Sequence, residues 1–178
     1  MKKIFLACGI VLLGAFVFQI WIGFAGELQC RKKLTSIFVA TLKMYRNDHD
    51  QNYPDSLAIL AEWFMNPIYD SEKKELSQDE ELQHKASLIF GKCPCSKTHM
   101  GPFSSIDRWG DYVYVAWTNN GRDAHADYPL AYERSVSHHF RRGVNVILVD
   151  GTVFWDSNAS FIRQFVEQHP SLGLCIPN

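Results

Sequence analysis

The strongest constraint on this chain is an alternating run of apolar residues near its C-terminal end, interrupted by one Asp-Gly pair. The run extends from Arg142 to Trp155, and the interruption is Asp150-Gly151. Asp-Gly between β-branched runs is a strong hairpin signal, because glycine accepts a positive φ and the aspartate side chain can bond nearby backbone. The sequence therefore predicts two short antiparallel strands joined at Asp150-Gly151.

Both faces of the first of these strands are largely apolar. Alternation along a strand assigns Val144, Val146 and Leu148 to one face, and Asn145, Ile147 and Val149 to the other. A strand that is apolar on both faces is typical of the interior of a sheet that is covered on both sides. We therefore expect an interior strand in an ordinary β-hairpin.

The N-terminal segment is as apolar as a membrane span. Residues 4–25 contain no charge, and Gln19 is the only strongly polar side chain among them. A helix of this length measures roughly 33 Å, enough to cross a bilayer core. A cleaved signal peptide is the alternative, with Lys2-Lys3 as its basic start and Gly23-Phe24-Ala25 as its cleavage site. The run is longer than an ordinary signal core, so we expect residues 1–25 to be an uncleaved transmembrane anchor and residues 26–178 to be one globular domain.

The segment after the anchor has helical periodicity. From Glu27 to Asn47, apolar or small side chains recur at helical spacing and form one stripe: Cys30, Leu34, Ile37, Phe38, Thr41, Met44 and Tyr45. A second, shorter helix is expected after a cap at Asp55 or Ser56, ending just before Pro67. Residues 71–85 are charged, which predicts a surface excursion with at most a turn or two of exposed helix.

The second half of the chain favours strands. Residues 87–90, 112–117 and 129–133 are strand candidates that precede the hairpin. A last short helix is expected around Phe161–Val166, capped within Asp156-Ser157-Asn158. The predicted fold class is α+β, in which a long N-terminal helix, running from the membrane anchor into an amphipathic segment, packs on a small, mostly antiparallel sheet.

Four cysteines lie outside the predicted anchor, namely Cys30, Cys93, Cys95 and Cys175. An even number in an exported domain makes them disulfide candidates. Direct pairing of Cys93 with Cys95 would be strained, so Cys175 is a plausible partner for one of them, and the three possible pairings stay open. A zinc site built from Cys93, Cys95 and His99 lacks a fourth ligand and matches no common zinc module.

The charge balance does not indicate nucleic-acid binding, and no sequence motif identifies a catalytic residue. The chain has 18 Lys and Arg against 19 Asp and Glu, so nothing in its charge indicates nucleic-acid binding. An exported enzyme using His138 or His139 with Asp150 is conceivable, but a lone His-Asp pair is commonly a structural hydrogen bond.

Four segments, taken in order, resemble one bacterial family. They are Cys30 to Tyr53-Pro54, Cys93-Pro94, the Asp107-Arg108-Trp109-Gly110-Asp111-Tyr112-Val113-Tyr114 segment, and Leu130-Ala131-Tyr132-Glu133 followed by His139 and residues 143–153. Together they resemble the type IV pilin-like proteins, nearest the major pseudopilins of type II secretion and the related family with a C-terminal His-(nine residues)-Asp-Gly motif. The residues that carry the structural motif are Asp107, Trp109, Gly110, His139, Gly143, Asn145, Asp150 and Gly151.

The resemblance implies a non-enzymatic structural protein of the inner (cytoplasmic) membrane with a single pass and a globular domain outside the cytoplasm. Its partners would be the membrane, proteins of a secretion or pilus-like assembly, and other copies of itself. No cofactor is implied except calcium, because related pseudopilins can carry a calcium-binding loop; the candidate ligands here are Asp123, Asp127 and Asp150.

Two departures from the family pattern define what kind of relative we expect. Ten residues separate His139 from Asp150, where the family has nine. If Gly23-Phe24 were the processing site, Leu28 would occupy the fifth mature position, where pilin-like proteins have glutamate, and Glu27 lies one residue early. We therefore expect a permanently anchored relative without the prepilin leader motif.

Overall fold

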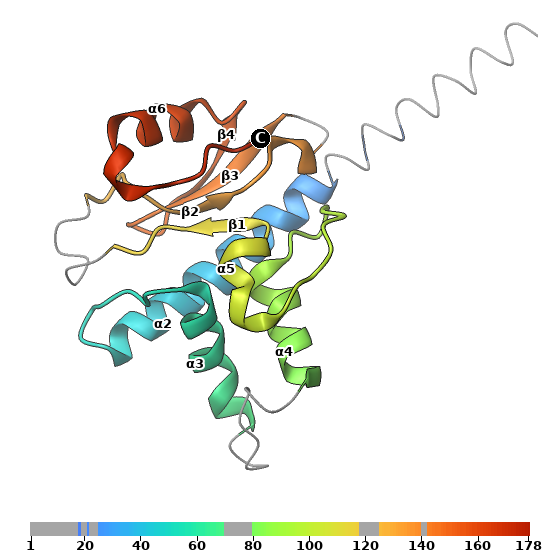
Figure 1. The fold of residues 1–178 in the computed structure, drawn as a ribbon, viewed down its shortest axis with the longest axis vertical. Helices are drawn as coiled ribbons and strands as arrows, with labels where there is room; N and C mark the ends of the chain where they lie inside the picture. The colour runs from blue at the N-terminus through green and yellow to red at the C-terminus, as the bar shows by residue number, and fades with distance from the viewer. Residues whose placement is uncertain (1–17, 19–20, 22–24, 70–79, 118–124, 140–141) are drawn as a thin grey trace, which may run out of the picture.

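The computed structural model describes residues 18, 21, 25–69, 80–117, 125–139 and 142–178 (Figure 1). The predicted anchor, residues 1–25, lies almost entirely outside this part of the chain. Among the described residues, no helix is both long enough and apolar enough to cross a membrane. The described part combines helices with one sheet, so the α+β class is confirmed.

The sheet is an antiparallel meander of four strands in sequence order. These are β1 (Tyr112–Tyr114), β2 (Pro129–Glu133), β3 (Gly143–Leu148) and β4 (Val153–Ser157). Strand β3 lies between β2 and β4, which confirms the predicted interior strand. The β3–β4 hairpin turns where the Asp-Gly pair predicted, and Gly151 has a φ of +88°. That left-handed conformation is the reason for a glycine there.

The sheet is covered on both faces, as the apolar pattern of β3 requires. Ile147 packs into the larger core cluster, on the face that the long N-terminal helix covers. Val144 and Val146 pack into the smaller cluster with Ile162 of α6 (Ser160–Gln168), which covers the opposite face (Figure 1). The Asp156 carboxylate accepts hydrogen bonds from the backbone N–H groups of residues 161 and 162 at 3.1 and 3.0 Å, so it caps the first turn as predicted, although the N-cap residue itself is Ala159, just after the predicted tripeptide.

Residues 25–48 form one continuous helix that ends in α2 (Ala40–Asp48) and contains a π-helical stretch, Leu34–Val39. Its buried stripe consists of Cys30, Leu34, Phe38, Val39, Thr41, Leu42 and Tyr45. Met44 was placed on this stripe by its heptad spacing, and that assignment was wrong, because its side chain is 55% exposed. A π-turn holds more residues than an α-turn and shifts the phase of the face that follows it, so that Leu42 is buried although the predicted stripe did not include it.

The remaining helices pack beside the N-terminal helix and below the sheet in Figure 1. They are α3 (Leu57–Tyr69), α4 (Glu80–Ala86) with a π-helical continuation (Ser87–Gly91), and the short α5 (Ile106–Trp109), which follows a 3₁₀ turn (Phe103–Ser105). A 3₁₀ turn (Val136–His138) separates β2 from β3, and another (Pro170–Leu172) follows α6.

Three local predictions in this region were wrong. Residues 87–90 form helix instead of a strand, because Leu82, Ala86 and Phe90 recur every four residues and all three are buried. Part of the predicted surface excursion is therefore a packed helix, and residues 70–79 lie outside the described part. Helix α3 also continues through Pro67 to Tyr69 instead of stopping before the proline.

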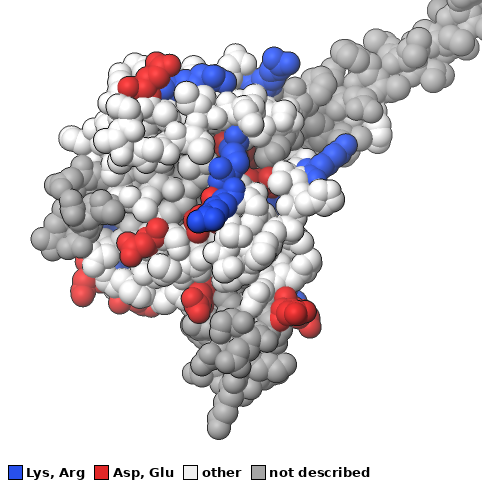
Figure 2. Space-filling model, viewed as in Figure 1, with Lys and Arg blue, Asp and Glu red and all other residues white. Residues whose placement is uncertain are grey.

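The surface mixes charges of both signs. On the face drawn in Figure 2, Lys and Arg lie mainly towards the sheet and the start of the long helix, whereas Asp and Glu line the lower edge. Together with the net charge of −1, this pattern is typical of a solvated protein surface.

Candidate metal centre

Glu133, the last residue of β2, is a carboxylate placed inside the core. Strand alternation puts it on the same face as Ala131, the face covered by the long helix, and its side chain is fully buried. One carboxylate oxygen, Oε2, accepts the backbone N–H of Asn145 at 2.7 Å and the side-chain Nδ2 of Asn145 at 3.2 Å. The neighbouring strand β3 therefore fixes the orientation of this carboxylate.

His139 meets the other oxygen of the same carboxylate. It follows the 3₁₀ turn Val136–His138, and its Nε2 lies 2.9 Å from Glu133 Oε1. The imidazole is buried and packs edge-on against the Trp155 ring. Burial alone would lower the pKa of His139, but hydrogen bonds to Cys93 and Glu133 and the charges of these two groups outweigh it and raise the pKa to about 10.

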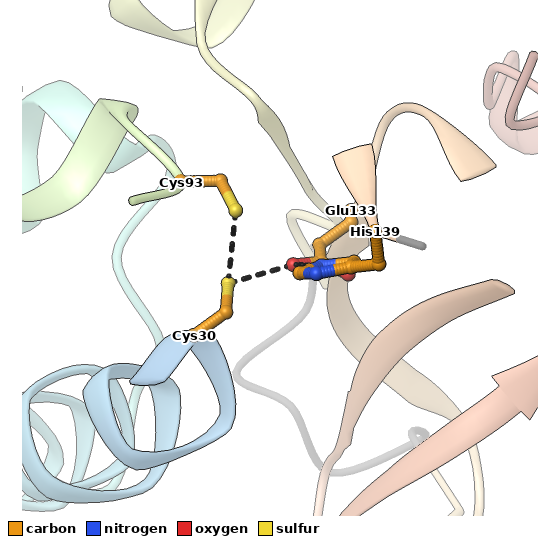
Figure 3. A group of neighbouring side chains, drawn as sticks. All are labelled: Cys30, Cys93, Glu133 and His139. Carbon is orange, nitrogen blue, oxygen red and sulfur yellow. Dashed lines mark hydrogen bonds and ion pairs between the residues drawn. The ribbon is translucent and has the colours of Figure 1, made fainter. Parts of the chain in front are cut away.

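Two cysteines complete the group, as Figure 3 shows. Cys30 comes from the long helix, and its Sγ lies 2.7 Å from Glu133 Oε1 and 3.1 Å from Cys93 Sγ. Both thiols are fully buried. The hydrogen bond with Cys93, followed by burial and the charge of Glu133, raises the pKa of the Cys30 thiol well above its usual range. Tyr112 of β1 closes the group, with its hydroxyl 3.4 Å from Cys30 Sγ.

Asp111 holds the backbone that carries Cys93. Its Oδ2 accepts the N–H of Cys93 at 2.8 Å, and its Oδ1 accepts the hydroxyl of Ser96 at 2.8 Å. Its own backbone N–H donates to the carbonyl of Gly91 at 2.7 Å. The segment that resembles the pseudopilin Trp-Gly motif thus fixes the position of one cysteine of the buried group.

One cation lies beside this group. Lys33 is one helical turn after Cys30, and its Nζ donates to the carbonyl oxygens of Leu88 and Lys92. The ammonium lies 5.5 Å from the centroid of the Tyr112 ring. Burial lowers the pKa of Lys33, and the neighbouring Cys30, Cys93 and Asp111 oppose that shift.

We name Cys30, Cys93, Glu133 and His139 the CCEH cluster. One ligand atom from each of them lies within 4.8 Å of the other three. Among the residues that the structure describes, this is the one group of three or more potential metal ligands found. Two sulfurs, an imidazole and a carboxylate are a donor set that suits zinc, whereas calcium takes oxygen ligands alone.

The disulfide candidates divide between the cluster and the surface. Cys30 and Cys93 face each other, whereas Cys95 is partly exposed and Cys175 is exposed. None of the four forms a disulfide in the structure. The partner suggested for Cys93 or Cys95 was Cys175, but the structure places Cys30 against Cys93. The zinc alternative also had one wrong companion for Cys93: His99 lies exposed on the surface, whereas the Cys95 thiol does form a hydrogen bond with Cys93.

The other motif residues serve the fold around the cluster. Asp107 Oδ1 accepts the N–H of Leu57 at the start of α3, at 2.9 Å, and the Trp109 indole donates to the Pro102 carbonyl at 2.8 Å. The backbone N–H of Gly110 bonds to the Ile106 carbonyl. At Gly143, a Cβ atom would lie 2.7 Å from the Asp156 carbonyl oxygen, so only glycine fits there without a shift.

The structure does not bring His139 and Asp150 together. His139 lies before the first residue of β3, and Asp150 lies in the turn after its last residue, where its carboxylate accepts from the N–H and hydroxyl of Thr152. The six residues of β3 span about 20 Å. His138, the alternative, lies in the 3₁₀ turn before it. His139 and Asp150 therefore do not form a catalytic pair in this structure.

The calcium candidates are exposed or outside the described residues. Asp123 lies outside them, while Asp127 and Asp150 are exposed. The backbone N–H of Asp150 donates to the Ala126 carbonyl, so the two loops adjoin. The described part of the chain shows no third acidic ligand grouped with this pair.

Glu133 is the residue of the CCEH cluster that the sequence did not single out. It appeared only as the end of a strand candidate and as the last residue of the Leu130-Ala131-Tyr132-Glu133 segment of the family resemblance. A signal was present, because alternation along Pro129–Glu133 places this carboxylate on an inward face. A carboxylate at an inward strand position is seldom left without a partner.

Comparison with known proteins adds no relative: no family model, curated protein or solved structure matches the chain. The resemblance to pilin-like proteins therefore stays a hypothesis based on the motifs alone.

Proposed function

We propose that this chain is a non-enzymatic, membrane-anchored structural protein with a pilin-like head, which serves a secretion system or a surface assembly. The observation that carries the proposal is the division of the long helix into two parts. From Cys30 onwards, one face of this helix is buried against the sheet. Before Cys30, the large apolar side chains among the described residues are exposed: Leu28 of the helix at 46%, and Phe18 and Trp21 earlier in the chain at 59 and 65%.

Exposed aromatic and aliphatic side chains at one helix end need a nonaqueous surrounding or a partner. The sequence before them is apolar as far back as Ile4. A bilayer would cover such a segment, and Trp21 would then lie near the membrane interface, where tryptophan is enriched. The head would be held at the membrane surface by the same helix that forms part of its core.

The CCEH cluster supports a structural role and not a catalytic one. Each of its four residues is at most 5% exposed. A substrate therefore cannot reach their side chains unless the head unfolds. The cluster lies between the long helix and the sheet, where it connects the two parts of the fold. A site of this kind suits stability, whereas a catalytic metal site keeps an open position.

Membrane fractionation of the full chain tests the anchor. We expect the chain to stay in the membrane pellet after alkaline carbonate extraction. Replacing both Leu12 and Leu13 by Arg puts two charges into the middle of the apolar run, each costing about 3 kcal/mol at the centre of a membrane helix, and should shift the chain to the soluble fraction. A matched Leu12→Ala, Leu13→Ala variant should remain in the pellet.

N-terminal sequencing of the same material distinguishes an anchor from a signal peptide. The anchored protein keeps its first residues. Recovery of a soluble chain that starts at Gly26 would overturn the anchor, and an unextracted Leu12→Arg, Leu13→Arg chain would show that the head itself binds the membrane.

A further inference from the structure

We propose that the CCEH cluster binds one zinc ion, held by the sulfurs of Cys30 and Cys93, a carboxylate oxygen of Glu133 and a ring nitrogen of His139. The four ligands come from four separate segments: the long helix, the loop after α4 and its π-helical continuation, β2, and the β2–β3 connection. The site would therefore fasten the N-terminal helix to the sheet.

The spacing of the four ligand atoms fits a tetrahedral ion after a small expansion. Zinc bonds of about 2.0–2.3 Å place neighbouring ligand atoms of a tetrahedron roughly 3.3–3.8 Å apart. The cluster has contacts of 3.1 Å between the two sulfurs, 2.7 Å from Cys30 to Glu133 and 2.9 Å from His139 to Glu133. In these three pairs hydrogen bonds hold the ligand atoms closer than a metal would, by less than about 1 Å, and all four ligand atoms lie within 4.8 Å of one another.

The surroundings of the cluster supply what a zinc site needs. The second oxygen of Glu133 is held by two donors of Asn145, and Asp111 holds the backbone of Cys93. Such outer contacts orient metal ligands. The Nδ1 of His139 and the Oδ1 of Asn145, on two residues that contact Glu133, are buried without a hydrogen bond to any described residue.

Charge favours a divalent cation at this position. Two thiolates and one carboxylate carry three negative charges, and zinc reduces this to one. The Lys33 ammonium, fixed by two backbone carbonyls one helical turn from Cys30, compensates the remaining charge. A buried site requires this balance, because an unpaired charge in the core is costly.

A Cys30–Cys93 disulfide is the competing state. It would use the two sulfurs and leave Glu133 and His139 as a buried pair beside them. Zinc uses all four groups, and it uses them in the closed four-ligand arrangement typical of structural zinc. The two states exclude each other within one molecule, which makes the test decisive.

The experiment uses the full chain, extracted in detergent and purified without chelators. We expect about one zinc per chain by elemental analysis. Exchange for Co²⁺ should produce the intense visible bands of a tetrahedral cobalt site together with sulfur-to-cobalt charge-transfer bands in the near ultraviolet. These measurements use the wild-type chain, so they test the proposal even if a substituted chain fails to fold.

Variants then assign the ligands. Cys30→Ser, Cys93→Ser, Glu133→Gln and His139→Gln should each lower the bound zinc at least tenfold or weaken the cobalt bands. The matched control is Cys175→Ser, which removes an exposed thiol outside the cluster and should leave both signals unchanged.

Three results would overturn the proposal. One is a wild-type chain that neither contains zinc nor takes up Zn²⁺ or Co²⁺. The second is a linked peptide joining Cys30 to Cys93 in stoichiometric amount under non-reducing mass spectrometry. The third is cobalt bands that persist unchanged in Cys30→Ser. None of these results affects the membrane anchor, which is tested separately.

Discussion

At the residue scale, the most informative side chain is Glu133. A carboxylate at this inward position satisfies three groups at once: His139, the Cys30 thiol and the backbone N–H of Asn145. The neighbouring strand residue Asn145 also contributes its side-chain amide. Loss of the carboxylate therefore leaves several buried polar groups without a partner, whether or not a metal is bound.

We expect Glu133→Ala to lower the free energy of unfolding by about 3–5 kcal/mol, the cost of removing one member of a buried pair. Urea unfolding of the full chain in detergent, followed by tryptophan fluorescence, measures this change. The matched control is Glu81→Ala, which removes a carboxylate that is 76% exposed and paired with Lys85. That change should cost less than about 1 kcal/mol. Equal losses for both variants would contradict the role given to Glu133.

Individual residues of the cluster were only partly predictable. Cys30, Cys93 and His139 stand out in the sequence by type and motif, and each was singled out. Their grouping was not predictable, because Cys93 lies 63 positions and Glu133 103 positions after Cys30 in the sequence. Contacts over such distances follow from the packing of the helix on the sheet, which spacing alone does not encode.

At the scale of elements, local signals worked where the geometry is local. The hairpin has a dipeptide that requires a positive φ, and α6 has an aspartate that caps it; both were placed correctly. The strand predicted for Ser87–Phe90 was wrong because a short run of three apolar residues fits a strand or a buried helix equally well. The π-stretch in the long helix could not be read from periodicity, so Met44 was assigned to the wrong face.

The two faces of the long helix provide a matched pair of substitutions. Phe38 is 1% exposed and contacts the rings of Phe90 and Tyr112, with centroid distances of 6.0 and 5.8 Å. We expect Phe38→Ala to destabilise the head by about 3–5 kcal/mol, and Met44→Ala, on the exposed face, to cost less than about 0.5 kcal/mol. Chemical unfolding of the two full-length variants makes the comparison. A larger loss of stability for Met44→Ala would show that Met44 lies on the buried face of the helix, as the heptad spacing predicted.

At the scale of the whole molecule, composition and pattern were sufficient for the α+β class and for the long helix against an antiparallel sheet. Composition and pattern did not show that α6 and the long helix cover opposite faces of the sheet, because tertiary packing sets the direction in which each connection turns. The membrane anchor rests on residues 4–25 and remains a proposal. So does the assembly role, which rests on the resemblance to pilin-like proteins.

An assembly role predicts contacts between copies. An apolar span whose only strongly polar side chain is Gln19 can associate laterally in a bilayer, so amine-reactive cross-linking in native membranes should yield dimers and higher species. Dilution of the chain with added lipid separates specific association from crowding, since a specific complex persists. The Leu12→Arg, Leu13→Arg chain, released from the membrane, should give monomers. Recovery of monomers alone at native abundance would count against assembly.

The wide separation of the cluster residues along the chain has a consequence for synthesis. The helix that carries Cys30 leaves the ribosome first, and Glu133 follows 103 residues later, which takes about 5–20 s at ordinary translation rates. During that interval the buried face of the helix has no sheet to cover it, and its thiol is open to oxidation or to a wrong partner. Closing so long a loop is also slow. Until the last strands emerge, the buried face of this helix has no partner within the chain, so a chaperone or the membrane surface would have to cover it for that interval.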